Sequence, residues 1–332
     1  MATTVTVIGA GAWGTTLAGL LADKGTSVCL WAREQAVVDT ITTSHENTLF
    51  LPGIALSPAL RATTSMPEAL ADADLLLLAV PSRWMRTVCR EMRGYLPNAV
   101  PPVLTVTKGL EIETGARMSE IIRAELPALP AIAALSGPNL APEIAQGQPA
   151  ATVVASEHLA LAAQVQELLM TANFRPYTSV DMVGVEVCGA VKNVIAIGMG
   201  ICEGMGYGDN AKAALLTRAV AEISRLVLCL GGQAETVAGL SGTGDLIATC
   251  FSPMSRNHRV GLALGRGQRA ADALGGSGQV AEGVPTTEAV IRLARRLGVE
   301  MPISEQVYAI LFDGRTPTKA VHALMTRMRR SE

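Results

Sequence analysis

The amino-acid sequence predicts an α/β protein with an N-terminal doubly wound parallel sheet and an all-helical C-terminal domain. Two observations support this fold class. From residue 4 to about residue 155, short apolar and β-branched runs alternate with helical stretches, as in parallel sheets with helices on both faces. After Asp181, long helical patterns replace the alternation. We therefore expect two domains, residues 1–181 and residues 182–332, which a chain of 332 residues is long enough to form.

The strands of the expected sheet are short apolar runs. The run from Leu75 to Val80 is apolar throughout, which is typical of a strand buried on both faces. A helix at residues 15–24 follows the first strand and ends at Gly25. The expected strands are Thr4–Ile8, Ser27–Trp31, Leu75–Val80, Val103–Thr107, Ile132–Leu135 and a further one that contains Val153 and Val154.

Composition narrows the possible classes of protein. Hydrophobic residues make up 49% of the chain and its formal net charge is −2, so we expect a globular protein without a nucleic-acid partner. The longest apolar stretch, residues 183–205, contains charged residues such as Glu186 and Lys192, so we expect no membrane span. We also expect no signal peptide. The six cysteines and four histidines lack metal-ligand spacing, which predicts free thiols in a reducing cytoplasm and no metal site.

The turn after the first expected strand has a glycine pattern. Residues 9–14 read GAGAWG, a GxGxxG sequence between a strand and a helix, and such a loop binds the pyrophosphate of a dinucleotide. Gly9 permits the tight turn, Gly11 lets the backbone approach the pyrophosphate, and Gly14 lets helix and strand pack closely. The helix N-terminus offers free N–H groups to the phosphates. This pattern predicts a Rossmann-type dinucleotide site; the alternative is an ordinary glycine turn.

The end of the second expected strand bears on the choice of cofactor. Sites specific for NAD usually carry an acid there, about 20 residues after the glycine loop, which binds the ribose 2′-hydroxyl. This chain has Arg33, which can pair with the 2′-phosphate of NADP, while Glu34 keeps NAD possible. We therefore expect NADP or NAD as cofactor, with NADPH used at least as well as NADH. The alternative is that Arg33 is a solvated surface residue.

Two further strand ends carry polar residues. In open α/β sheets, ligands bind outside the carboxyl ends of the strands. Lys108 follows the strand that ends at Thr107, and Ser136, Gly137, Pro138 and Asn139 follow the next strand. The position of Lys108 predicts a cation in the ligand crevice, although a surface lysine in a turn would show the same pattern.

In the second domain, Lys192 stands out because it lies inside an apolar helical stretch. Such a setting favours the neutral amine and lowers the pKa of a lysine, which suits proton transfer at neutral pH. Asn193 adds a neighbouring hydrogen-bonding group. A lysine that extends its charged end to solvent from a helix edge is an equally good interpretation.

Two later segments add polar groups. Asp245 lies in a glycine-rich loop that leads into a helix, where it could also be an N-cap. The cluster Ser255, Arg256 and Asn257 could bind a phosphate, because the arginine guanidinium recognises phosphate as a fork. The alternative is a basic helix start on the surface.

Together these motifs resemble the bacterial-type NAD(P)-dependent glycerol-3-phosphate dehydrogenases over nearly the whole chain. Each motif alone is weak, but several in one order are specific. The motifs are Gly9–Gly14, Thr107–Glu111, Ser136–Pro138, Val191–Val194, Gly242–Leu246, Ser255–Asn257 and Gln279–Gly283.

The resemblance implies a role for individual residues. Lys192 matches the family's catalytic lysine, the proton donor and acceptor at the substrate oxygen, and Lys108 matches a lysine that contacts both cofactor and substrate. Further substrate-binding positions are Gly137, Asn139, Asp245, Ser255, Arg256 and Asn257. Further cofactor-binding positions are Ala12, Trp13, Arg33, Ala141, Arg256, Val280 and Glu282, besides Gly9, Gly11 and Gly14.

The resemblance also implies a reaction and a cellular setting. The expected reaction is reversible NAD(P)H-dependent reduction of dihydroxyacetone phosphate to sn-glycerol 3-phosphate, by a cytoplasmic homodimer that supplies glycerophospholipid synthesis. The chain departs from the family at Asn139, where a small hydroxyl residue is usual, so we expect altered affinity there. Two other functions remain open: a related two-domain reductase of a phosphate-free hydroxy acid, and a dinucleotide-binding redox sensor without turnover.

Overall fold

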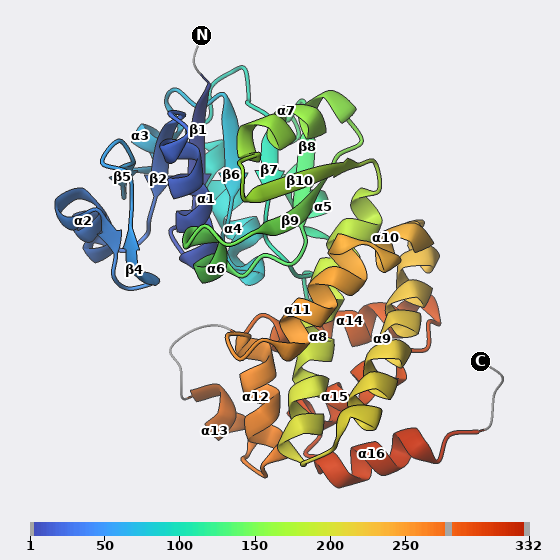
Figure 1. Ribbon diagram of the computed structural model, residues 1–332. Helices are drawn as coiled ribbons and strands as arrows, with labels where there is room; N and C mark the ends of the chain where they lie inside the picture. Colours follow the sequence, from blue (N-terminus) through green and yellow to red (C-terminus); the bar gives the residue numbers. More distant parts are fainter. Residues whose placement is uncertain (1–2, 276–280, 329–332) are drawn as a thin grey trace. The chain divides into compact units, whose positions relative to one another are not determined.

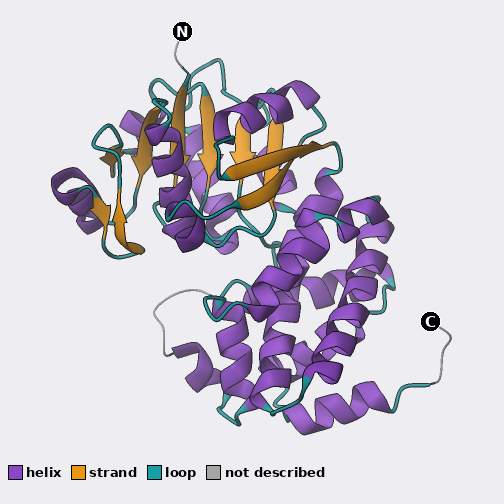
Figure 2. Ribbon diagram, in the orientation of Figure 1, coloured by secondary structure: helices purple, strands orange, loops and turns teal. Residues whose placement is uncertain are grey.

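The computed structural model describes residues 3–275 and 281–328 and divides the chain into two compact units. The first unit comprises Met1–Lys108 and Met118–Met182, and the second comprises Gly109–Arg117 and Val183–Glu332. The first contains a large β-sheet with helices, whereas the described residues of the second form helices (Figure 2). The fold class predicted from the sequence is thus confirmed.

The sheet of the first unit has eight strands in the order β10-β9-β8-β7-β6-β1-β2-β5 (Figure 1). β1 and β2 have the predicted bounds, whereas β6 and β7 end two residues early. Beyond β6, the hydroxyl of Thr107 donates to the carbonyl of Val80 at 2.7 Å. This carbonyl therefore accepts a hydrogen bond from a side chain. The strands are β1 (Thr4–Ile8), β2 (Ser27–Trp31), β5 (Arg61–Thr63), β6 (Leu75–Leu78), β7 (Val103–Thr105), β8 (Ile132–Ser136), β9 (Ala150–Ala155) and β10 (Phe174–Ser179).

One strand pair departs from the predicted parallel arrangement. β9 pairs with β8 in the antiparallel direction, with Leu135 opposite Val154, whereas the other six pairs of this sheet are parallel. The reason is the short connection between β8 and β9, whose helix α6 (Ala141–Ala145) has only five residues. A parallel crossover needs a connection that returns along the whole strand, usually through a longer helix. The chain therefore turns back at the same end of the sheet.

Helices cover both faces of this sheet (Figure 1). Helix α1 packs against α6 and α7, while α4 packs against α5. A two-stranded hairpin of β3 (Glu46–Asn47) and β4 (Leu51–Ala55) adjoins α1. The helices are α1 (Ala12–Asp23), α2 (Gln35–Ser44), α3 (Met66–Leu70), α4 (Met85–Arg93), α5 (Met118–Glu125) and α7 (Leu159–Leu169), with a 3₁₀ turn at Ser82–Trp84.

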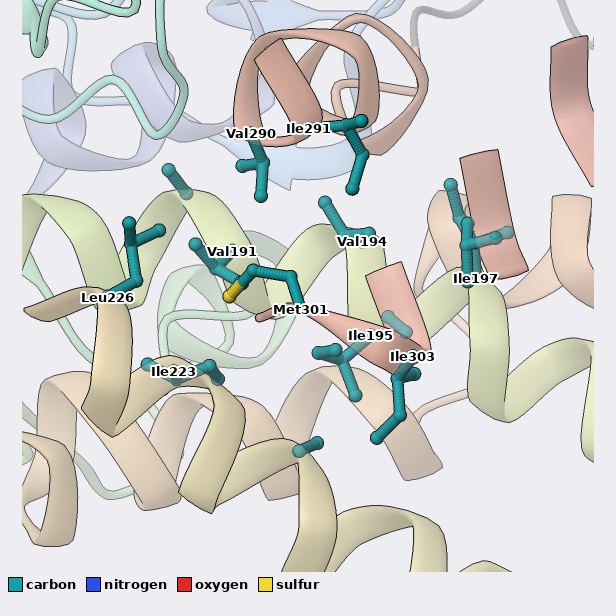
Figure 3. Close-up of a cluster of buried hydrophobic side chains, with 14 of the residues drawn as sticks. Val191, Val194, Ile195, Ile197, Ile223, Leu226, Val290, Ile291, Met301 and Ile303 are labelled. Atoms are coloured by element: carbon teal, nitrogen blue, oxygen red, sulfur yellow. The ribbon is translucent and has the colours of Figure 1, made fainter. Parts of the chain in front are cut away.

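The second unit is organised around helix α8 (Met182–Gly204). This helix is long and apolar enough to cross a membrane, but its apolar window is completely buried, as in the core helix of a soluble protein. Its side chains pack with those of α9, α14 and α15 (Figure 3). The other helices are α9 (Asp209–Cys229), α10 (Ala234–Ala238), α11 (Asp245–Phe251), α12 (Arg256–Gly265), α13 (Ala270–Gly275), α14 (Gly283–Leu297), α15 (Pro302–Phe312) and α16 (Pro317–Met325), with a π-helical turn at Leu240–Gly244.

A segment that follows Lys108 belongs to the helical unit, which the sequence did not indicate. Leu110 is buried in the core of the second unit, and Arg117 forms an ion pair of 2.7 Å with the buried Glu186 of α8. The guanidinium of Arg296 donates to the carbonyl of Thr114 at 2.7 Å. Lys108 is therefore the last residue of the first unit before the chain enters the second.

Candidate active site

The glycine loop after β1 is constrained by its own packing at two of its three glycines. Gly9 has a φ of +113°, and a Cβ there would lie 2.7 Å from the carbonyl oxygen of Ala79. A Cβ on Gly14 would lie 2.0 Å from the carbonyl oxygen of Gly9. Helix α1 starts at Ala12, three residues before the predicted start, so Gly14 lies in its first turn. Both positions therefore require glycine for the fold itself.

Gly11 differs from the other two glycines. Its φ of −66° suits any residue, and a Cβ there would have no atom of residues 3–275 and 281–328 within 4 Å. Packing of the protein therefore gives no reason for a glycine at this position. It is the N-cap of α1, next to N–H groups that have no acceptor within the helix. Open space beside such groups fits the close approach of a phosphate, so this loop fits a dinucleotide.

Three other predicted cofactor residues lie around the start of α1. Ala12 and Trp13 begin the helix, and the Trp13 ring packs edge-to-face on Phe174, with ring centroids 6.3 Å apart. Ala141 begins α6, and its carbonyl accepts a hydrogen bond of 3.3 Å from the Thr16 hydroxyl of α1. The first unit therefore brings Ala12, Trp13 and Ala141 to adjacent helices.

Arg33 lies just after β2, on the surface. Its side chain is 73% exposed and forms an ion pair of 2.6 Å with Glu34, the next residue. An exposed pair of this kind contributes little to stability. The guanidinium is thus held by a weak interaction that a phosphate could replace.

Lys108 and Gly137 come together at the carboxyl ends of β7 and β8. The Lys108 ammonium donates to the Gly137 carbonyl at 3.0 Å. A Cβ on Gly137 would lie 2.8 Å from the Cα of Thr152, so close packing against β9 requires glycine there. Asn139 donates from Nδ2 to the Thr152 hydroxyl at 2.9 Å, while its buried Oδ1 has no hydrogen-bond partner among the described residues.

Lys192 lies in the middle of α8 and is only 7% exposed. Its ammonium is hydrogen-bonded to the Asp245 carboxylate and, at 2.6 Å, to the Thr249 hydroxyl, both on α11. The apolar helical stretch is buried as a whole. The expected apolar setting of the Lys192 ammonium was wrong, however, because this group belongs to a buried ion pair. The carboxylate offsets the cost of burying the ammonium. Asp245 is the first residue of α11, and the N-cap position of this helix belongs to Gly244. Sequence reasoning missed Thr249, whose only signal is its position one helical turn after Asp245.

Asn193 bonds to Asn257 and not to its neighbour Lys192. The Asn257 Nδ2 donates to the Asn193 Oδ1 at 2.9 Å, and the Asn257 Oδ1 accepts from the Gly283 N–H at 2.9 Å. This buried amide therefore joins α8, α12 and the start of α14. Both ends of the Asn257 side chain are engaged within the protein, which favours a positioning role over direct phosphate binding.

Three more predicted residues lie at or near the start of α12: Ser255, Arg256 and Glu282. The Ser255 hydroxyl caps this helix by accepting from the His258 N–H at 3.2 Å. Arg256 follows with an exposed side chain. Partial desolvation lowers its pKa, and the Glu282 carboxylate opposes this shift, yet the guanidinium remains charged at neutral pH. Val280 lies outside the described residues.

Comparisons with known proteins cover the whole chain. A family model described as NAD-dependent glycerol-3-phosphate dehydrogenase N-terminus matches residues 4–162, and the corresponding C-terminus model matches residues 181–322. The glycerol-3-phosphate dehydrogenase [NAD(P)+] of Geobacter sulfurreducens is 48% identical over 100% of this chain and 99% of its own. That of Thermobifida fusca is 48% identical over 99% of this chain and 98% of its own.

A solved structure agrees with these sequence relatives. The crystal structure of glycerol-3-phosphate dehydrogenase from Coxiella burnetii superposes with a TM-score of 0.94 at 38% identity, over 98% of this chain and 99% of that one. The matches span both units, and the resemblance inferred from the motifs is confirmed. This chain belongs to the NAD-dependent glycerol-3-phosphate dehydrogenase family.

Proposed function

We propose that this protein catalyses the reversible NAD(P)H-dependent reduction of dihydroxyacetone phosphate to sn-glycerol 3-phosphate. The observation that carries the proposal is the buried ammonium of Lys192, which is held by the Asp245 carboxylate and the Thr249 hydroxyl. Membership in the dehydrogenase family supports it. A cation fixed in a buried place stabilises negative charge more strongly than one in water.

Lys192 is the proposed proton donor and acceptor. The bound nicotinamide supplies or accepts the hydride. As the substrate ketone is reduced, negative charge grows on its oxygen, and the Lys192 ammonium stabilises this charge and donates a proton to it. In the reverse direction the amine takes the proton back. Thr249 and Asp245 fix the position of the Lys192 Nζ, because both accept hydrogen bonds from it.

The substrate phosphate is the proposed ligand of Arg256. Its exposed guanidinium is the planar, two-pronged donor that phosphate groups match. Ser255 and Asn257 orient the start of α12, through the helix cap and the bridge to Asn193. Lys108 adds positive potential near the substrate. Gly137 and Asn139 are the remaining proposed substrate positions.

The cofactor is proposed to bind at the start of α1. The proposed dinucleotide-binding domain is residues 1–181 without residues 109–117, which group with the proposed substrate domain, residues 182–332. The open side of Gly11 and the N–H groups of the first helical turn would hold the pyrophosphate. The Arg33 guanidinium would release the Glu34 carboxylate and bind the 2′-phosphate of NADP. The other proposed positions are Gly9, Ala12, Trp13, Gly14, Lys108, Ala141, Arg256, Val280 and Glu282.

A direct assay tests this function. We expect absorbance of the reduced nicotinamide to fall when the protein is mixed with dihydroxyacetone phosphate and either NADPH or NADH. Dihydroxyacetone without the phosphate should react far more slowly, because its phosphate-binding energy is lost. Cofactor binding without turnover of any phosphorylated ketone would contradict the proposal.

The cellular setting is also a proposal. We expect a cytoplasmic homodimer whose product enters glycerophospholipid synthesis. Sedimentation at several protein concentrations tests the oligomeric state, and fractionation of cells tests the compartment. A monomer at all concentrations or a protein in the membrane fraction would contradict these two points.

A further inference from the structure

A buried asparagine outside the glycine pattern holds the dinucleotide loop in place. Asn47 lies on β3 of the hairpin and is 0% exposed. Its Nδ2 donates to the carbonyl of Ala10 at 2.8 Å and to the hydroxyl of Thr15 at 2.8 Å. Its Oδ1 accepts from the N–H of Phe50 at 3.1 Å. The carboxamide thus uses both of its donors and its acceptor within the first unit.

The two partners of the Asn47 Nδ2 are themselves connected. The Thr15 hydroxyl donates to the Ala10 carbonyl at 3.2 Å, so this carbonyl accepts from two side chains. Ala10 is the second residue of the GxGxxG loop, and Thr15 lies in α1. One buried triangle of hydrogen bonds therefore joins the hairpin, the glycine loop and the first helix.

The direction of the Ala10 carbonyl matters for an anion. A carbonyl oxygen that turned toward a phosphate would repel it, whereas the N–H groups at the start of α1 attract it. Asn47 and Thr15 hold this oxygen in the buried interior, where Ala10 is only 5% exposed. The next residue, Gly11, keeps an open side. A loop held ready in this way loses less conformational entropy when it binds a ligand.

We propose that Asn47 is a positioning residue for dinucleotide binding, acting through the Ala10 carbonyl and together with Thr15. This inference rests on the proposed cofactor site. Asn47 itself is completely buried and does not contact the cofactor. Its role is to keep the loop in the shape that receives the pyrophosphate. Loss of Asn47 therefore weakens binding of every ligand that carries a pyrophosphate.

The experiment measures binding by the folded protein and does not depend on turnover. The dissociation constants of NADPH, NADH and ADP are determined by calorimetry for wild type and Asn47→Ala. The variant should bind all three about tenfold more weakly, since losing one or two buried hydrogen bonds corresponds to a factor of this order. The equal loss for ADP locates the effect at the pyrophosphate half. At saturating cofactor, the KM for dihydroxyacetone phosphate should not change.

A second position and a matched control separate positioning from stability. Thr15→Val should weaken ADP binding, Thr15→Ser should restore it, and Thr15→Val should add little in the Asn47→Ala background, because both residues act on one carbonyl. Ser156→Ala is the control. Ser156 directly follows β9, is 0% exposed and donates to the Ile132 carbonyl of β8 at 2.7 Å. This control should lower the melting temperature without changing the ADP dissociation constant.

The outcomes distinguish this inference from the proposed function. If wild type binds ADP and both cofactors while folded Asn47→Ala binds them equally tightly, the positioning role is overturned and the function stands. A loss for NADPH alone would overturn it too, because that result places the effect at the 2′-phosphate. If wild type binds neither cofactor, the proposed function fails and this inference fails with it.

Discussion

The two units build their candidate sites from different materials. In the first unit, backbone groups form the candidate pyrophosphate loop: N–H groups at the start of α1, a glycine with an open side, and the Ala10 carbonyl, which buried side chains hold. In the second unit, side chains form the site, and they are paired with one another across helices. The glycine turn of the first site is local in sequence, although Asn47 reaches it from 37 residues away. The second joins Lys192 to Asp245 across 53 residues.

This difference has a physical origin. A backbone site needs residues that allow a particular chain geometry, so its requirement is a glycine spacing along one turn. A site made of side chains on helices needs only that two helices pack with the right residues facing each other. Adding a Cβ should therefore disturb the backbone site, and removing a charge should disturb the side-chain site. The following predictions use this contrast.

The largest effect should come from the side-chain site. Lys192→Met removes the proton donor, so kcat should fall by about 10²–10⁴-fold, the usual contribution of general acid catalysis. Dinucleotide binding should be nearly unchanged because Lys192 is not one of the proposed cofactor positions. Steady-state kinetics and calorimetry measure the two quantities. A variant with near wild-type kcat would show that Lys192 does not carry the proton.

A double variant shows whether the loss of kcat comes from unfolding. Lys192→Met leaves Asp245 buried without its cation, which can destabilise a protein by about 3–5 kcal/mol. The double variant Lys192→Met/Asp245→Asn removes that charge and should recover stability without recovering kcat. Lys212→Met, which breaks an ion pair of 3.2 Å with Glu203, is the control and should keep wild-type kcat.

At the backbone site, substitution of one glycine should affect folding and substitution of another should affect cofactor binding. Gly14→Ala places a Cβ 2.0 Å from the Gly9 carbonyl and should destabilise the first unit strongly. Gly11→Val should lower the melting temperature much less than Gly14→Ala, because a Cβ there meets open space, but it should weaken cofactor binding by about tenfold or more. Melting curves and cofactor titrations check both. Unchanged cofactor affinity in Gly11→Val would place the pyrophosphate elsewhere.

Arg256 tests whether the side-chain site recognises phosphate. Arg256→Lys keeps the charge but loses the two-pronged geometry, so kcat/KM for dihydroxyacetone phosphate should fall by about tenfold or more. The loss should be much smaller for dihydroxyacetone, which has no phosphate. Equal losses for the two substrates would mean that Arg256 does not bind this group.

The smallest effect should come from Arg33, an exposed side chain outside the glycine loop. If Arg33 pairs with the 2′-phosphate, wild type should prefer NADPH over NADH by up to roughly tenfold. Glu34, 2.6 Å away, reduces this preference. Arg33→Ala should remove the preference, as measured by kcat/KM for each cofactor. A cofactor ratio equal to that of wild type would make Arg33 an ordinary surface residue.

Sequence patterns predicted the fold class and most strands because each depends on local chemistry. The apolar run from Leu75 to Leu78 is buried on both faces, and the glycines at 9 and 14 are where the turn and the close packing require them. The direction of β9 was not predictable from its own residues. It depends on the short connection through α6, whose length as a helix emerges only in the folded chain.

The sequence by itself determined which residue types are available: a glycine turn after a buried strand, and a lysine inside an apolar helix. Only the tertiary structure decided their partners. It brought Thr249 and Asp245 into hydrogen bonds with Lys192. It likewise paired Asn257 with Asn193 and Asn47 with the Ala10 carbonyl. The physical reason is that burial of a polar group requires a partner, and the partner comes from whichever helix or strand packs there. Separation along the chain says nothing about that choice.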